Sequence, residues 1–343
     1  MHTYYTDVPE FLNKFDKQEH HKLRKEGQNE DVFAEAIRSD DIDKFQDLMA
    51  FSNHPINSKI GPSIYESNNS CKDIKLIEYA ALCGSLNIFK FLWMNLADLT
   101  YNLLGYAVAG GNYEIVHIVE SKRPKYTQEA LQMAIQFHRN DLVHYIIETA
   151  DIEMNLNILF TCISSFNYEI FQEYAPSIIK DVNEIQNDIT MLHAACQCGN
   201  IDVVNILVQI PELDPNIRDK NGKTSLHIAA RGGYMNIVKS LVKFTNVNIE
   251  ARDKMKNSPL HLASLFCRLD VVMFLATLQK IDVNAVDRVF SCFLIKEFIL
   301  FIYRSAYLIA CQYGFLDIVK FLIRVKGVDK ELKDKSGVIS CFI

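Results

Sequence analysis

The chain has 343 residues, of which 49% are hydrophobic and 23% charged, and its formal net charge is -6 at pH 7. This composition is sufficient for a buried core, and no block of basic residues suggests a nucleic-acid partner. The longest apolar run, 290–303, is interrupted by Lys296 and Glu297 and is shorter than the roughly 20 apolar residues that a membrane-spanning helix needs. We therefore expect neither nucleic acid nor a membrane as a partner.

The N-terminus and the cysteines bear on the compartment. Asp7, Glu10 and Asp16 stand where a secretory signal would carry basic and then apolar residues. The nine cysteines are scattered and odd in number, which favours reduced thiols over a disulfide framework. We expect a cytoplasmic protein, with the nucleus as the alternative.

The segment that precedes the repeats divides into two parts. Residues 1–51 are expected to form an N-terminal helical region, with a helix pair over 32–49. Residues 52–73 are rich in Ser, Asn, Pro and Gly and have no periodicity. A loop of this length is unusual in a compact domain, so it predicts a flexible connection, with a functional excursion as the alternative.

Short repeats are expected over 74–186. A pair of apolar residues recurs there at nearly constant intervals, beginning at Ile88, Ile115, Leu142 and Ile170. Small residues precede these pairs, as in Tyr79-Ala-Ala-Leu-Cys-Gly84. The pattern predicts degenerate helix-pair repeats with shortened turns.

A longer repeat follows over 187–337. Three near-copies of one phrase read Thr190-Met-Leu-His-Ala-Ala-Cys, Thr224-Ser-Leu-His-Ile-Ala-Ala and Ser258-Pro-Leu-His-Leu-Ala-Ser, and the sequence numbers of their histidines increase in equal steps of 34. A fixed period of this length is typical of stacked repeats. In the clearest unit, Gly222 follows Asn221 in a turn, Gly233 ends the first helix, and a 3,4-spaced apolar stripe marks the second helix.

The phrase resembles the Thr-Pro-Leu-His-x-Ala-Ala pattern of the ankyrin repeat, a β-turn followed by two antiparallel helices. The resemblance implies an all-α ankyrin-repeat solenoid of stacked helix-turn-helix units joined by β-turn loops. It also implies that the histidines support the turns through hydrogen bonds between neighbouring units. The residues expected to hold the repeat are Thr190, His193, Gly199, Gly222, Thr224, His227, Gly233, His261, Gly314 and Gly337.

A metal or catalytic role for these histidines is the alternative. Stacked units lie roughly 10 Å apart, like packed helices, whereas zinc needs ligands about 2 Å away. The N-terminal block resembles a domain of unknown function that precedes ankyrin repeats in protist proteins, trichomonads especially. That domain has no assigned activity.

The regular period fails near the C-terminus. The repeat should resume soon after Asp287, but the matching Leu308 comes 13 positions late, which places an insertion within about 289–304. The insertion opens with Val289-Phe-Ser-Cys-Phe-Leu294, and the tail, 338–343, reads Val338-Ile-Ser-Cys-Phe-Ile343 and stops where a helix should begin. One hypothesis is that both are translated intron starts. The other is a genuine hydrophobic hairpin followed by a natural short tail.

Motifs with catalytic or metal-binding chemistry are weak. Gly222-Lys-Thr224 is similar to the end of a phosphate-binding loop, but Ile217 stands where that loop needs a glycine. Cys196-x-Cys198 lacks a second pair that would complete a zinc site. We therefore expect no cofactor, no metal and no enzyme activity. The alternative is an enzyme hidden in residues 1–180.

The expected function is protein–protein interaction through the turn tips and the concave helix face. A net basic ridge at the turns suggests a partner with an acidic surface, and the chain is expected to be monomeric. An adaptor that recruits clients to an enzyme complex is one alternative. Another alternative is that the chain is a truncated ankyrin protein, or the product of a wrongly assigned gene structure, and has no stable function. The candidate partner-binding residues are Arg218, Lys220, Asn221, Lys223, Arg252, Lys254, Lys256 and Arg288.

Overall fold

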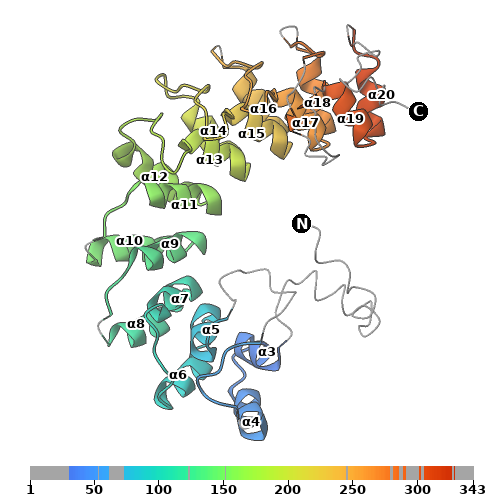
Figure 1. The fold of residues 1–343 in the computed structure, drawn as a ribbon. Coiled ribbons are helices and arrows are strands. Elements are labelled where there is room, and N and C mark those ends of the chain that lie inside the picture. Colours follow the sequence, from blue (N-terminus) through green and yellow to red (C-terminus); the bar gives the residue numbers. More distant parts are fainter. Residues whose placement is uncertain are drawn as a thin grey trace. The chain divides into compact units, whose positions relative to one another are not determined.

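A computed structural model of the chain describes residues 31–52, 54–61, 73–122, 124–150, 152–244, 246–278, 281–285, 289–290, 301–302, 305–326 and 328. Within these residues the chain forms 18 helices and two very short strands. The predicted all-helical repeat fold is therefore confirmed (Figure 1). The chain divides into two compact units, Met1–Met154 and Asn155–Ile343, which are described separately.

The first unit contains four helix pairs. In each pair the second helix returns antiparallel to the first, and the first helices α3, α5, α7 and α9 pack on one another in sequence order. The residues expected to mark three of the second helices, Ile88, Ile115 and Leu142, are all buried, and each lies in the second helix of a pair. The helices are α3 (Val32–Arg38), α4 (Ile42–Ser52), α5 (Leu76–Cys83), α6 (Leu86–Met94), α7 (Leu103–Gly110), α8 (Tyr113–Glu120), α9 (Gln128–Gln136) and α10 (Asn140–Thr149).

Part of the predicted loop over 52–73 is tied to the start of α5. Ser52 belongs to α4, and residues 54–61 turn back so that Lys59 pairs with Lys75 in an isolated bridge. The amide of Ile60 donates to the carbonyl of Ile74 at 3.0 Å. Residues 53 and 62–72, on which the prediction of a flexible connection mainly rests, lie outside the described residues.

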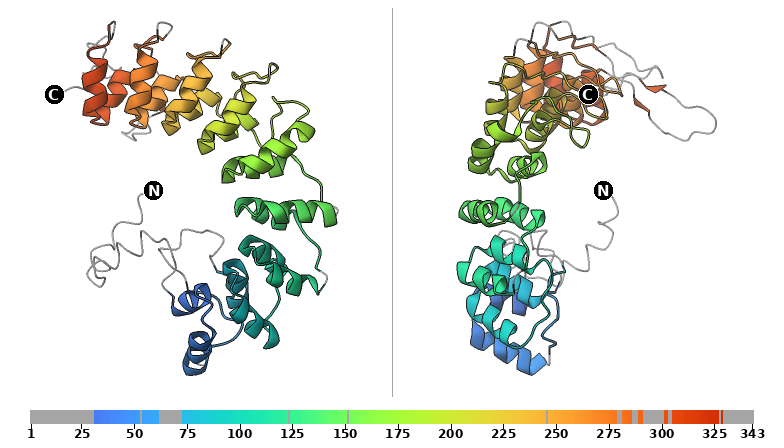
Figure 2. Two further views of the ribbon diagram at one scale, coloured as in Figure 1. Left: turned by 180° about the vertical axis from the view of Figure 1, so that it is seen from behind. Right: turned by 90° about the vertical axis from the view of Figure 1, so that its left-hand side faces the viewer.

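The second unit continues with five helix pairs. Its first helices again pack on one another, and the segments that join successive pairs from α13 to α18 project from one side of the stack (Figures 1 and 2). The helices are α11 (Leu156–Ser165), α12 (Tyr168–Ile178), α13 (Met191–Cys198), α14 (Ile201–Leu207), α15 (Ser225–Gly232), α16 (Met235–Val242), α17 (Pro259–Leu265), α18 (Leu269–Ala276), α19 (Ala306–Gln312) and α20 (Leu316–Leu322).

The residues that cap the first helices reproduce the sequence period. Thr190, Thr224 and Ser258 are N-caps at regular intervals, and the next N-cap, Ser305, comes later than the period requires. Between Ser258 and Ser305, β1 (Val289–Phe290) pairs antiparallel with β2 (Phe301–Ile302). This pairing suits the hairpin interpretation of the insertion, while the intron hypothesis concerns the transcript and stays a prediction. Residues 329–343, with the tail, lie outside the described residues.

A residue in the left-handed conformation ends the first helix of every repeat from α5 to α19. Glycine fills this position in five of the eight described repeats, as at Gly199 (φ 77°) and Gly233 (φ 80°). His138 (φ 54°), Phe166 (φ 58°) and Cys267 (φ 54°) fill it in the other three. Glycine tolerates this conformation without steric cost and the other residues do not, so the chain keeps the backbone geometry even where the sequence has lost the glycine.

Three further observations complete the fold. Among the described helices, none is long and apolar enough to cross a bilayer. The thiols of Cys162, Cys196, Cys198 and Cys267 are free, as expected. Cys311 is disulfide-bonded, so the expectation of reduced thiols is wrong for that residue.

Candidate functional site

The three repeat histidines lie buried at the starts of α13, α15 and α17. At the first of them, the hydroxyl of Thr190 is 2.8 Å from Nδ1 of His193, and the backbone N–H of Thr190 donates to the same nitrogen at 3.3 Å. Nε2 of His193 lies 3.1 Å from the carbonyl oxygen of Lys223, in the next turn. Because a carbonyl only accepts, Nε2 carries the proton and Nδ1 is the acceptor.

The same arrangement recurs one repeat later. Nδ1 of His227 is 2.9 Å from the Thr224 hydroxyl, and its Nε2 is 3.0 Å from the carbonyl oxygen of Asn257. Nδ1 of His261 is 2.7 Å from the Ser258 hydroxyl. The hydrogen bonds between neighbouring units that the ankyrin resemblance implies are thus present at His193 and His227.

Burial sets the protonation state of these histidines. Desolvation lowers the pKa of His193 and of His227 below the ordinary value, although the carbonyl that each one contacts acts in the opposite direction. Both imidazoles are therefore neutral at pH 7. Among the described residues, no three His, Cys, Asp or Glu side chains gather in a way that could hold a metal ion.

In the first unit, Glu78 has the structural role that the repeat histidines have in the second unit, and the sequence did not predict it. Glu78 occupies the third position of α5, where His193 stands in α13, and it is 6% exposed. Its carboxylate accepts a hydrogen bond from the backbone N–H of Lys75 at 2.7 Å and another from the hydroxyl of Thr100, in the next repeat. Glu78 therefore makes the same two connections as His193 with different chemistry, so no residue pattern could reveal it.

Each long turn is built around one aspartate. Oδ1 of Asp219 accepts from the amides of Asn221 and Lys223, both at 2.8 Å. One repeat later, Oδ1 of Asp253 accepts from the amides of Met255 at 2.9 Å and Asn257 at 2.8 Å. The Oδ1 atoms of these carboxylates are directed into the turns and are used by backbone amides, so they are not free to accept hydrogen bonds from a ligand.

Neighbouring turns are also linked to each other. The amide of Lys254 donates to the carbonyl of Asn221 at 3.0 Å, and Nη1 of Arg218 donates to the carbonyl of Arg252 at 2.8 Å. Gly222, with φ 76°, lies so close to the next turn that an added Cβ would stand 3.0 Å from the Lys254 nitrogen. Gly222-Lys-Thr224 is thus a repeat turn, in agreement with the sequence argument against a phosphate-binding loop.

The basic side chains of the turns separate into two groups. Arg218 and Arg252 are engaged with turn carbonyls, Arg252 through Lys256 O at 3.2 Å. Lys220, Lys254 and Lys256 are exposed, and Lys220 forms a surface ion pair with Asp188 at 3.3 Å. We call the exposed lysines, together with the half-buried Lys223, the turn ridge. Two further predicted residues lie outside the described residues: Arg288, a candidate for partner binding, and Gly337, a candidate for holding the repeat.

Opposite the turns, aromatic and cationic side chains that the sequence analysis did not single out follow the ends of the first helices. The guanidinium of Arg231 lies over the ring of Phe266, 4.7 Å from its centroid, and Tyr313 stacks on Phe315 with centroids 5.9 Å apart. Phe266 is 38% exposed and Tyr313 51% exposed. Their signal in the sequence is their place beside the left-handed residue of each repeat.

Comparisons with known proteins agree with this geometry. Residues 159–253 and 192–287 match the family described as ankyrin repeats (3 copies), and residues 94–174 match a domain of unknown function, DUF3447. No curated protein matches the chain. The likeness to trichomonad proteins in particular stays a prediction.

The family carries a general expectation about function. Ankyrin repeats generally mediate protein–protein interaction and are typically not enzymes. The matched segments cover the helix pairs α11/α12 to α17/α18 and, before them, most of the short repeats. Ankyrin repeats are thus found over residues 159–287 and a DUF3447 domain over residues 94–174, and the two matches overlap at 159–174.

Proposed function

We propose that this protein is a non-enzymatic interaction module that binds an acidic surface of a partner protein through the turn ridge. The observation that carries the proposal is the separation of charge within each turn. The carboxylates of Asp219 and Asp253 cap backbone amides, whereas the side chains of Lys220 and Lys254 are exposed, that of Lys220 in a surface ion pair with Asp188. The turns are therefore basic at their tips although the chain as a whole is acidic.

The rigidity of the turns supports the same proposal. A surface that is already ordered loses less conformational entropy when it binds. Here the Lys254 amide, the Asn221 carbonyl and the Arg218 guanidinium connect consecutive turns, so the spacing of the lysines is fixed before a partner arrives. Arg218 and Arg252 act in this proposal mainly by holding the turns, and the lysines make the contact.

Affinity capture from the source cell, with identification by mass spectrometry, tests the proposal. The bait is the full chain, compared with the double charge reversal Lys220→Glu/Lys254→Glu. The matched control is Lys239→Glu/Lys243→Glu, which reverses two exposed lysines on α16 and its C-cap. The expected result is a protein captured by the wild type and the control but lost with the turn variant.

The captured protein also distinguishes a passive partner from an enzyme complex, which is the adaptor alternative. Capture that is unchanged by Lys220→Glu/Lys254→Glu refutes the turn ridge as the contact surface. We place the interaction in the cytoplasm, supported by the exposed free thiol of Cys267. Fluorescence microscopy of a tagged chain checks that location.

A further inference from the structure

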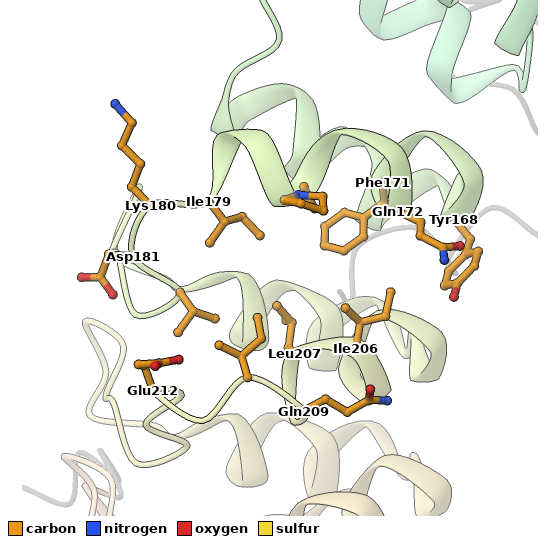
Figure 3. Close-up of a pocket in the computed structure, with 14 residues that line it drawn as sticks. Tyr168, Phe171, Gln172, Ile179, Lys180, Asp181, Ile206, Leu207, Gln209 and Glu212 are labelled. Atoms are coloured by element: carbon orange, nitrogen blue, oxygen red, sulfur yellow. The ribbon is translucent and has the colours of Figure 1, made fainter.

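A cleft separates the second helices α12 and α14, at the point where the short repeats give way to the longer ones (Figure 3). Its volume is about 750 Å³, which lies in the range of binding pockets rather than of packing defects. It lies on the second helices, away from the turn ridge, and therefore does not rest on the proposed function.

Comparison with the next pair of second helices, α14 and α16, explains why the space between α12 and α14 is open. There, α14 and α16 pack together, and Ser240 donates to the side-chain carbonyl of Asn205 at 3.2 Å. Counted from the left-handed residue of each repeat, Gln172 corresponds to Asn205 and Ile206 corresponds to Ser240. Gln172 and Ile206 cannot form the Asn205–Ser240 hydrogen bond, because isoleucine has no polar side-chain atom, and both line the cleft.

The floor of the cleft is apolar and its rim is polar. Phe171 and Leu207 are buried at its base, and Ile179, Ile206 and Ile210 are half-buried beside them. Isoleucine side chains left in contact with water lose part of the free energy that burial would provide. The cleft is therefore a surface on which apolar side chains of a partner gain stability by binding.

Charge distinguishes the two ends of the cleft. Asp181 and Glu212 are exposed at one end, and Tyr168, Gln172 and Gln209 lie at the other (Figure 3). Lys180 lines the same end, and its side chain extends away from Glu212 in the same view. Two carboxylates and one ammonium leave this end with a net negative charge, whereas the other end is polar but uncharged, which favours a ligand with a positive charge at one end only.

We propose that this cleft binds an amphipathic helix of a partner protein, with aliphatic side chains along one face and a lysine or arginine at one end. The cleft follows the whole of α12, whose 11 residues correspond to about 16 Å of helix. That length matches about three turns of a bound helix, whose residues at i, i+3, i+4 and i+7 reach the floor. The basic end lies beside Asp181 and Glu212.

Selection from a library of displayed helical peptides tests this proposal with the full chain as target. Bound peptides are counter-selected on Gln172→Trp, in which an indole fills the cleft from its exposed rim and no core residue is lost. Ser177→Trp is the matched control, because Ser177 is exposed on the same helix and does not line the cleft. Thermal melting confirms that both variants are folded.

Peptides with an aliphatic stripe and a basic end are expected to be enriched. Their affinity, measured by fluorescence anisotropy, should fall about tenfold or more with Gln172→Trp and stay unchanged with Ser177→Trp. Asp181→Lys/Glu212→Lys should weaken the same peptides and strengthen versions in which glutamate replaces the basic residue.

Three outcomes overturn the proposal. One is that no peptide is enriched. Another is that the enriched peptides lack an aliphatic stripe or bind Gln172→Trp as well as wild type. The third is that only a small apolar dye binds the cleft and is displaced by the indole, which would make it a pocket for a small molecule.

Discussion

Arg268 lies over Gly233 and fixes one repeat to the next. Its Nε donates to the carbonyl of Arg231 at 3.0 Å, and a Cβ added to Gly233 would stand 2.7 Å from the Arg268 Cδ. Tyr234 takes the same place over Gly199, where an added Cβ would stand 2.6 Å from its ring. Gly199 and Gly233 therefore each serve both their own backbone and the side chain of the following repeat.

Gly233→Ala is expected to destabilise the second unit. The left-handed conformation costs a non-glycine residue about 1–2 kcal/mol, and the methyl group also displaces Arg268. Cys267→Gly, at the equivalent position of the next repeat, should instead stabilise by about 1 kcal/mol, because a non-glycine residue already bears that strain there. Urea unfolding of both variants measures the difference, and two shifts of the same sign would contradict this account.

His227→Leu should reduce the free energy of unfolding by about 2–3 kcal/mol. The substitution leaves the buried Thr224 amide and the Asn257 carbonyl without their partner, and unsatisfied buried groups carry most of that cost. His117→Gln is the control, since the His117 side chain is exposed and pairs only with Glu120 among the residues described. Chemical denaturation of the two variants should separate them clearly; equal losses would remove the special role of the repeat histidine.

The free energy of unfolding of the second unit should fall as the solution is acidified below about pH 6.5, which is the ordinary pKa of a histidine side chain. Burial lowers the pKa of His193 and His227 in the folded chain, so the unfolded chain binds more protons in that range and is favoured. The loss is at most about 1.4 kcal/mol per pH unit for each histidine and stops below the folded-state pKa. Urea midpoints measured between about pH 7.5 and about pH 5, which bracket the ordinary histidine pKa, give the slope of stability against pH. The variant His193→Gln/His227→Gln is the reference. An equal slope in the reference variant would exclude these histidines as its source.

Glu78→Ala should cost about 2–3 kcal/mol, because the Lys75 amide and the Thr100 hydroxyl both lose their acceptor. Glu78→Gln should cost less than about 1 kcal/mol, since an amide can accept from one group and donate to the other. Hydrogen exchange of the Lys75 amide locates the effect at the start of α5. If both variants lose the same stability, the charge of Glu78 matters more than the two contacts.

The sequence was sufficient for those features that depend on neighbouring residues. Thr190 and His193 are three positions apart, so their shared phrase predicts a helix start wherever it recurs, and Gly233 predicts a helix end for its own backbone. Where a different residue type takes the same position, the sequence pattern does not predict its role. Phe166 and Cys267 adopt the glycine conformation because packing of the adjacent helices outweighs the local strain, and Glu78 replaces a histidine with a carboxylate.

The cleft between α12 and α14 could not be predicted for a different reason. Gln172 and Ile206 are ordinary residues on their own helices, and only the distance between two helices decides whether they meet. The sequence also did not predict that the turn aspartates point into the turns. An aspartate in a turn is expected to be a surface charge, but Asp253 is only 5% exposed. Its burial leaves the lysine side chains as the exposed charged groups of that turn.

The insertion between Ser258 and Ser305 leaves the stack intact. α17 still packs on α19 and α18 on α20, although the two caps stand farther apart in the sequence than the regular period. The contacts between helices, and not the length of the connecting segment, therefore determine how one repeat sits on the next. Lengthening a flexible connection costs little, about 0.6 kcal/mol for each doubling. A connecting segment of this protein can thus gain or lose sequence, by splicing or by engineering, and acquire new contacts while the helical scaffold that presents it is left unchanged.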